Sequence, residues 1–195
     1  MKILIVTDAW YPQINGVVRT LTKTRDHLIA MGHTVELITP ESFRTIPCPT
    51  YPEIRLSIFP GKKVAETIKF LQPDAIHIAT EGPLGLAARR YATSHGLNFT
   101  TAYHTRFPEY VRSRIGLPLR ITYMFLRWFH GSSQSVMAPT QTVISDLAKW
   151  RIGRPVLWPR GVDLSIFNPD NRSVKHRCEH TDGLAKSMAQ LDAAK

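Results

Sequence analysis

The feature that most constrains the fold is an apolar run at the start of the chain, followed by a short loop, a helical pattern and a second apolar run. Residues 3–6 (ILIV) predict a strand buried on both faces. From Val17 onward, apolar side chains recur at a helical spacing, and Gly32 stands where a helix commonly ends. Residues 35–39 predict a second strand. A helix that joins two apolar strands indicates a parallel sheet covered by helices.

The same alternation of strands and helices continues to residue 158. It predicts helices over 62–71, 83–95, 119–130 and 140–150 and strands over 75–79, 99–103, 135–138 and 155–158. The predicted fold class is therefore α/β, a Rossmann-like doubly wound parallel sheet, with a ligand at the carboxyl ends of its strands. We expect one domain over residues 1–170. Residues 171–195 have mixed charge and few large apolar side chains, so we expect a disordered tail or a short helix there.

The charge of the chain favours an anionic partner. Its formal net charge is +10, which suits a nucleotide, an anionic lipid surface or a nucleic acid. A nucleic-acid role ranks last because no binding motif accompanies the charge. The apolar run at the start of the chain is too short for a signal peptide, and no segment approaches the ~20 apolar residues of a membrane span. The chain has only two cysteines, which favours a reducing compartment. We therefore expect a cytoplasmic protein that at most rests on a membrane surface.

Three loops at predicted strand ends carry candidate site residues. The first, residues 8–17, enters a helix at Gly16, where backbone N–H groups and the helix dipole suit a phosphate. It matches neither GxGxxG nor the P-loop pattern, and a glycine that only permits the turn explains it equally well. The second, residues 80–85 (TEGPLG), would bring Glu81 to the same crevice, although an acid that only favours the helix dipole is the simpler explanation.

The third loop, residues 103–110 (YHTRFPEY), crowds polar and aromatic groups after an apolar strand, which favours a functional role for His104 over a purely structural one. The segment 160–163 (RGVD) closes the last strand and reads as a turn or as a link out of the domain. Basic residues between 112 and 127 alternate with aromatic ones. This pattern suits an anionic leaflet, and an exposed basic helix face over an ordinary core stripe explains it equally well.

Four motifs, taken together, resemble the amino-terminal domain of family 4 GT-B glycosyltransferases. They are LIVTDAWYPQINGVVRT, IHIATEGPLG, FTTAYHTRFPEY and PRGVDLSIFNP, in this order. The resemblance covers about residues 1–170 and is nearest to the branch of GDP-mannose-dependent α-mannosyltransferases and sulfoquinovosyl-diacylglycerol synthases. It implies the amino-terminal half of a GT-B fold, in which the acceptor binds this half and the nucleotide binds a second.

The resemblance also implies site residues. His104 would be catalytic, near the transferred sugar. The donor-binding residues would be Asn15, Gly16, Val17 and Arg160. The acceptor-binding residues would be Asp8, Arg19, Glu81 and Arg106. Transfer would retain the anomeric configuration, without a metal or another cofactor, because the nucleotide sugar (GDP-mannose or a UDP-sugar) is itself a substrate. The protein would stabilise the developing charge with dipoles and cations.

The family's second domain, which grips the nucleotide, should begin soon after Pro169, and residues 171–195 do not resemble its first strand. We therefore expect a truncated transferase of hexosyl, specifically mannosyl, units to a lipid or glycolipid acceptor, with little activity alone. An alternative is a non-catalytic module that binds a membrane or acceptor and pairs with a separate carboxy-terminal domain. A Rossmann oxidoreductase is disfavoured because the dinucleotide fingerprint is absent.

Overall fold

The computed structural model describes residues 1–48, 51–104, 118–159 and 161. The chain divides into two units, Met1–Arg160 and Gly161–Lys195, and nearly all of the second lies outside the described residues. The predicted tail over 171–195 and the predicted domain end at residue 170 also lie outside them.

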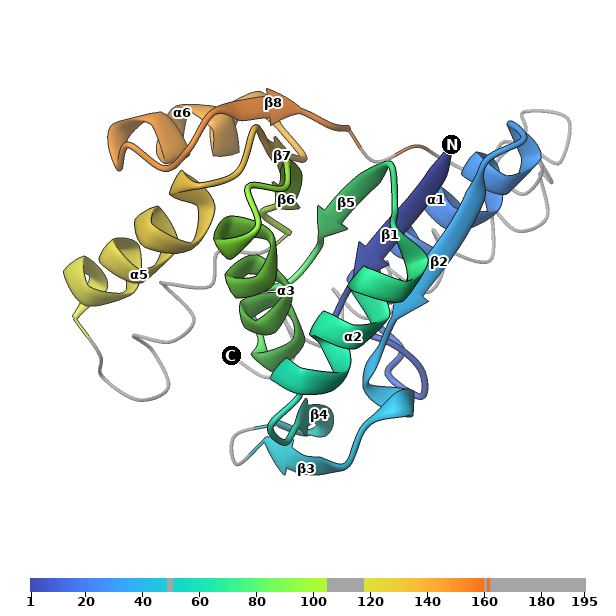
Figure 1. Cartoon of the computed structure of the whole chain (residues 1–195). Helices are drawn as coiled ribbons and strands as arrows, with labels where there is room; N and C mark the ends of the chain where they lie inside the picture. Colours follow the sequence, from blue (N-terminus) through green and yellow to red (C-terminus); the bar gives the residue numbers. More distant parts are fainter. Residues whose placement is uncertain (49–50, 105–117, 160, 162–195) are drawn as a thin grey trace, which may run out of the picture. The chain divides into compact units, whose positions relative to one another are not determined.

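The centre of the first unit is a parallel sheet (Figure 1). In the described residues its strands are β1 (Lys2–Val6), β2 (Thr34–Ile38), β5 (Ala75–Ile78), β6 (Phe99–Ala102), β7 (Val136–Ala138) and β8 (Pro155–Leu157). Their order across the sheet is β2-β1-β5-β6-β7-β8, and every neighbouring pair is parallel. The chain leaves β1 toward β2 and returns to β5 on the other side of β1, so the direction of winding reverses between β1 and β5.

Helices connect these strands, and each predicted helix is present with an end shifted by at most two residues. They are α1 (Gly16–Ala30), α2 (Gly61–Leu71), α3 (Pro83–Ser94), α5 (Leu119–Gly131) and α6 (Gln141–Lys149). Asn15 and Thr140 cap α1 and α6 with side-chain oxygens, and Gly32 and Gly96 follow α1 and α3 with the positive φ of 84° and 63° that glycine adopts without strain. Within the described ranges, no helix is both long enough and apolar enough to cross a membrane.

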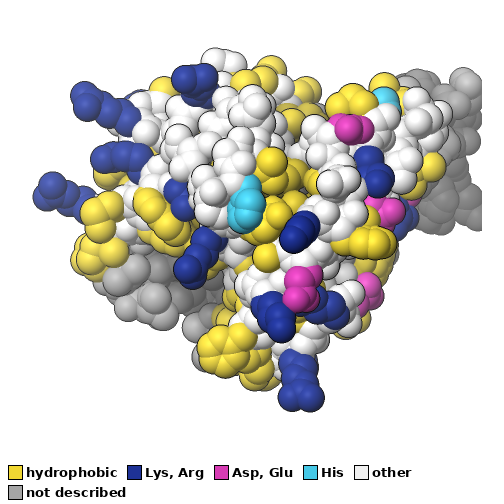
Figure 2. Space-filling model, in the orientation of Figure 1, with side chains coloured by type: hydrophobic (Ala, Val, Ile, Leu, Met, Phe, Trp, Pro, Cys, Tyr) yellow, Lys and Arg dark blue, Asp and Glu magenta, His cyan; other side chains and the backbone are white. Residues whose placement is uncertain are grey.

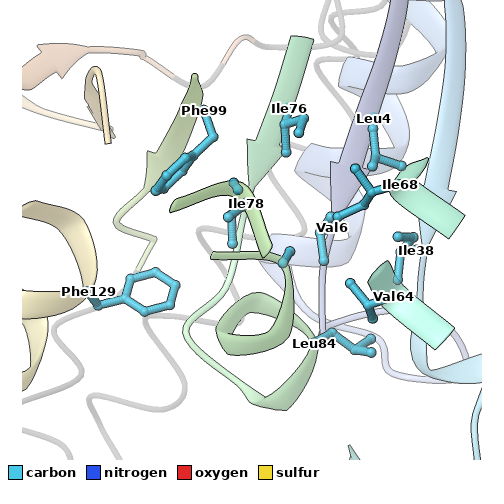
Figure 3. Packing of buried hydrophobic residues seen from close by; sticks show 12 residues of the cluster. Leu4, Val6, Ile38, Val64, Ile68, Ile76, Ile78, Leu84, Phe99 and Phe129 are labelled. Atoms are coloured by element: carbon cyan, nitrogen blue, oxygen red, sulfur yellow. The ribbon is translucent and has the colours of Figure 1, made fainter. Parts of the chain in front are cut away.

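Alternating side chains of the central strands pack on opposite faces of the sheet, which is the doubly wound arrangement that the sequence predicts. Leu4 and Val6 of β1 join one buried cluster with residues of α2, α3 and α5, shown in Figure 3. Ile5 instead packs with Leu21 of α1 on the other face. Because burying an aliphatic side chain stabilises a fold by about 1.5–3 kcal/mol, these two clusters fix the register of β1 between its neighbours.

One element of the fold escapes the sequence patterns. After a short 3₁₀ helix, η1 (Pro40–Ser42), strands β3 (Thr45–Cys48) and β4 (Tyr51–Ser57) pair antiparallel as a separate two-stranded sheet. The pairing is irregular between Pro47 and Cys48, since proline has no N–H to donate to a ladder. Met31, which directly follows the last residue of α1, Ala30, is 72% exposed, although the apolar spacing after Val17 would place it on the buried face.

Candidate functional site

The point where the winding reverses is bridged by the carboxylate of Asp8, which follows β1. Its Oδ1 accepts a hydrogen bond from the Leu84 N–H at 2.9 Å, and its Oδ2 accepts from the Thr80 hydroxyl at 2.9 Å and the Gly85 N–H at 3.3 Å. The Asp8 N–H donates in return to the Thr80 Oγ1 at 2.7 Å. Asp8 thus satisfies N–H groups in the first turn of α3 and ties the loop after β1 to the loop after β5.

Two glycines of the TEGPLG motif are required by this close approach. A Cβ built at Gly82 would lie 2.4 Å from the Asp8 carboxyl carbon, and one at Gly85 would lie 1.9 Å from the carbonyl oxygen of Thr80. Real Cβ atoms do not come so near, so any side chain at either position would push Asp8 or the β5 backbone away. The motif is therefore explained by packing at this junction, apart from any contact with a ligand.

Burial is the main influence on the ionisation of Asp8, which is only 4% exposed. Loss of hydration raises the pKa of this carboxyl above its ordinary value of 3.8, and nearby Glu81 adds to the rise. The hydrogen bonds from Leu84, Thr80 and Gly85 act in the opposite direction and do not cancel the effect of burial. Both oxygens are already occupied within the protein, so the assignment of Asp8 to acceptor binding stays a prediction.

A second chain of hydrogen bonds runs from Asp8 to the start of α1. The Gln13 side-chain amide donates to the Asp8 carbonyl at 3.3 Å, and the Asn15 amide donates to the Gln13 Oε1 at 3.0 Å. Asn15 Oδ1 then accepts from the N–H groups of Val17 and Val18, each at 3.0 Å. Of the backbone N–H groups predicted to bind a phosphate, that of Val17 therefore already donates to Asn15. A phosphate at this end would bind at Gly16 or displace the Asn15 oxygen.

A pocket of about 600 Å³ adjoins this helix end. The residues that line it include Asn15 and Gly16, predicted to bind the donor, and Arg19, predicted to bind the acceptor. Lys23 stands one helical turn beyond Arg19 and also lines the pocket. Two cations beside a helix amino terminus make this a site suited to an anion.

His104 lies two residues beyond the end of β6, half-buried, with its ring centroid 6.0 Å from that of Trp158. His77 of β5 contacts the same indole at 5.9 Å and shares a 2.9 Å hydrogen bond with the Thr100 hydroxyl. Burial, and secondarily the charge of His104, lower the pKa of His77 to about 4. His77 is therefore neutral at physiological pH.

Glu81, between β5 and α3, contacts a histidine that the sequence analysis did not single out. Its Oε1 lies 3.3 Å from Nε2 of His130, near the end of α5. The His130 side chain has no exposed surface, while the Glu81 side chain is 19% exposed. A carboxylate held between a buried imidazole and solvent combines a fixed position with access to a ligand.

The structure thus brings the predicted residues to one edge of the sheet in two groups. Asn15, Gly16 and Arg19 share the α1 pocket, whereas Asp8 and Glu81 lie between β1 and β5. Val17 is not among the residues that line the pocket, and its N–H donates to Asn15. His104 follows the next strand of the sheet, and the remaining two, Arg106 and Arg160, lie outside the described residues. The chemical roles given to these residues remain predictions.

Two contributors escaped the sequence analysis, Trp158 and His130, and Thr80 was included in a candidate loop without a role for its hydroxyl. Thr80 and Trp158 stand directly at strand ends, and position alone could have drawn attention to them. His130 ends an aromatic stretch of α5 that reads as ordinary core, so no local signal marks it.

The structure defines a Rossmann-like domain with a pocket lined by Arg19 and Lys23 beside its parallel sheet. The chain belongs to glycosyltransferase family 4, since the sequence profile described as Glycosyltransferase Family 4 matches residues 14–166. This confirms the predicted family.

Similar proteins include mannosyl and glucosyl transferases. A GDP-mannose-dependent alpha-mannosyltransferase of Mycolicibacterium smegmatis is 26% identical over 191 residues, which cover 88% of this chain and 51% of that protein. An alpha-monoglucosyldiacylglycerol synthase of Streptococcus pneumoniae is 27% identical, covering 86% and 42%. A sulfoquinovosyl transferase of Arabidopsis thaliana is 25% identical, covering 92% and 39%. The chain therefore spans about half the length, or less, of these relatives.

Among solved structures, sucrose-phosphate synthase from Thermosynechococcus elongatus superposes with a TM-score of 0.60 at 18% identity. The match covers 84% of this chain and 49% of that one. Because that protein is a GT-B glycosyltransferase, the match confirms the predicted fold class, a Rossmann-like half of a GT-B fold.

Proposed function

We propose that this chain is the acceptor-side half of a retaining GT-B enzyme that moves a hexosyl unit, specifically mannosyl, from a nucleotide sugar to a lipid or glycolipid acceptor. The observation that carries the proposal is the pairing of a basic pocket at the start of α1 with a carboxylate, Glu81, at the neighbouring strand end. The names of the relatives support GDP-mannose as donor and lipid-linked acceptors.

The donor diphosphate belongs in the α1 pocket. Arg19 and Lys23 supply positive charge there, and Gly16 lets a phosphate oxygen approach the helix end without a side chain in the way. The protein's task in such a transfer is to stabilise the charge that develops on the departing diphosphate. Contacts to the base and the sugar would come mainly from a second domain, so this chain alone should bind donors weakly and turn over little.

Titration calorimetry with GDP-mannose, UDP-glucose, GDP and UDP tests the donor assignment. We expect weak binding, about tenfold weaker again in Arg19→Ala because a cation facing a phosphate is lost. Arg25→Ala is the matched control, since Arg25 is on the same helix but pairs with Asp26 and lies over Trp10, outside the pocket. Equal loss in both variants would contradict the pocket. Tight binding with robust turnover by this chain alone would contradict the need for a second half.

A lipid acceptor has to be reached at a membrane, and α5 offers a face for this. Ile121, Met124 and Trp128 are 46%, 62% and 53% exposed at helical spacing along one side, with the exposed Arg120 and Arg127 beside them. Figure 2 shows hydrophobic and basic side chains side by side where Figure 1 places α5. Apolar side chains flanked by arginines fit the interface of an anionic leaflet, which for this enzyme would be the inner, cytoplasmic face.

Sedimentation with vesicles of phosphatidylcholine alone or with phosphatidylglycerol tests this surface. Wild-type protein should bind the anionic vesicles, less so at high salt, and Ile121→Ser/Met124→Ser should weaken binding about tenfold because two apolar groups no longer enter the interface. Phe70→Ser, which removes a side chain that is 85% exposed on α2, is the control and should bind normally. Failure of wild type to bind anionic vesicles at any salt concentration would rule out the membrane surface.

The same α5 surface favours a second candidate function, a non-catalytic module that docks on anionic lipid and pairs with a separate donor-binding domain. The donor titration separates the two. Binding to vesicles without any binding of a nucleotide or nucleotide sugar at the α1 pocket would favour the module over the transferase half.

A further inference from the structure

The imidazole of His130 belongs to a chain of hydrogen bonds in which only one assignment of donors and acceptors is consistent. The Ser133 hydroxyl donates to the His130 carbonyl at 2.7 Å, so its oxygen accepts the Thr101 hydroxyl at 3.2 Å. Having given its proton to Ser133, Thr101 Oγ1 can only accept from Nδ1 of His130, 2.8 Å away. Nδ1 therefore carries a proton.

The other ring nitrogen faces Glu81. Nε2 lies 3.3 Å from the Glu81 carboxylate, and no described residue offers it a hydrogen bond of good geometry. Nε2 is thus held against this carboxylate from inside the core.

Glu81 is at the same time placed for a ligand. It follows β5 beside the junction at Asp8, in the crevice where ligands of doubly wound sheets bind, and its side chain keeps 19% of its surface exposed. The Nε2 contact is to Oε1, and a carboxylate has about four sites that accept hydrogen bonds. The carboxylate retains the capacity to accept a hydroxyl group.

We propose that Glu81 accepts a hydrogen bond from a hydroxyl of the acceptor, a glycerol or sugar hydroxyl, and that His130 is the positioning residue that fixes this carboxylate from the core. The inference rests on the proposed transferase function and deepens it. His130 touches no substrate. It holds Glu81 in one orientation before the acceptor arrives, so less conformational entropy is lost on binding.

NMR spectra of the histidine ring nitrogens test the pairing in the free chain. We expect the ring-nitrogen signals of His130 to differ between wild type and Glu81→Gln, because Nε2 then faces a neutral amide in place of a carboxylate. Glu66→Gln, which removes an exposed carboxylate on α2, is the control and should leave the His130 signals unchanged. The same His130 signals in wild type and in Glu81→Gln would overturn the positioning role.

Binding of dioctanoylglycerol and octyl mannoside in detergent micelles tests the acceptor contact. Glu81→Gln and His130→Phe should each weaken binding about tenfold, and the double variant no more than either, because both remove the same oriented carboxylate. His130→Gln, whose amide still donates toward Glu81, should recover most of the affinity. Wild-type affinity in a folded His130→Phe, or additive losses in the double variant, would refute the role of His130.

Two outcomes separate this inference from the proposed function. If neither probe binds wild type, the proposed acceptor class is wrong, and the ring spectra then decide whether His130 holds Glu81. If His130→Phe does not fold, His130→Gln and Glu81→Gln are compared with wild type instead. Equal affinity for the probes in all three proteins would refute the acceptor contact.

Discussion

Replacement of Asp8 by alanine tests whether one buried carboxylate holds the site edge together. The substitution removes the acceptor for the Leu84 N–H, for the Thr80 hydroxyl and, at the longer distance of 3.3 Å, for the Gly85 N–H. A methyl group cannot accept a hydrogen bond, so the first turn of α3 would keep buried donors without partners. The loop after β1 would also lose its attachment to the loop after β5.

The expected loss follows from these contacts. Two hydrogen bonds of 2.9 Å to a charged acceptor contribute about 1.5–3 kcal/mol each, and the third, longer one less. Burial of the carboxylate opposes them, because removing Asp8 also removes the cost of its lost hydration. We expect a net decrease in the free energy of unfolding of about 2–4 kcal/mol, or roughly 5–15 °C in Tm for a chain of this size.

Urea unfolding of wild type and Asp8→Ala, followed by circular dichroism, measures this difference. Asp26→Ala is the matched control, since Asp26 is exposed on α1 and pairs with Arg25, a contact that contributes about 0–1 kcal/mol. If Asp8→Ala lost no more stability than Asp26→Ala, the hydrogen bonds at Asp8 would not stabilise the junction. The reasoning that connects β1 to α3 through this carboxylate would then be refuted.

Three further changes test neighbouring parts of the structure by the same unfolding measurement. Gly85→Ala should destabilise by about 3 kcal/mol or more, because its Cβ would overlap the Thr80 carbonyl; a loss below about 1 kcal/mol would contradict the close approach. Asn15→Ala should lose about 1 kcal/mol as the α1 cap disappears, and Asn15→Asp should not. Burial raises the pKa of Asp8 above 3.8, so the folded state binds this proton more tightly than the unfolded state. The free energy of unfolding of wild type, taken relative to that of Asp8→Asn, should therefore fall as the pH rises from about 4 through the raised pKa. A difference that stays constant or grows with pH would contradict this direction.

The sequence predicted the parallel sheet well because each of its strands is an apolar run that needs burial, and each helix carries its own start or stop residue. Asn15, Thr140 and Gly32 act through contacts within a few residues, so their effect is readable locally. Strands β3 and β4 gave no such signal. They form a small separate sheet with prolines in both runs, and proline usually argues against a strand.

The site was predictable only in part for a related reason. Parallel strands end at the same edge, so residues that follow apolar runs could be assigned to one crevice without a structure. Which of them touch each other could not. Glu81 pairs with His130 and Asp8 with the start of α3 through tertiary contacts that have no local pattern, and Val17 gives its N–H to Asn15.

The distribution of charge along this edge has a consequence for how the two substrates of the proposed reaction would approach. The cations Arg19 and Lys23 line the pocket at α1, while the carboxylate of Glu81 follows β5, the strand next to β1. A diphosphate is attracted to the first group and repelled by the second, whereas a neutral hydroxyl is bound by a carboxylate without such a penalty. Under the proposed function, the donor phosphates therefore bind on the α1 side and the acceptor hydroxyl on the β5 side. Reversal of the charge at Glu81, as in Glu81→Lys, should weaken acceptor binding and leave nucleotide binding unchanged or slightly tighter.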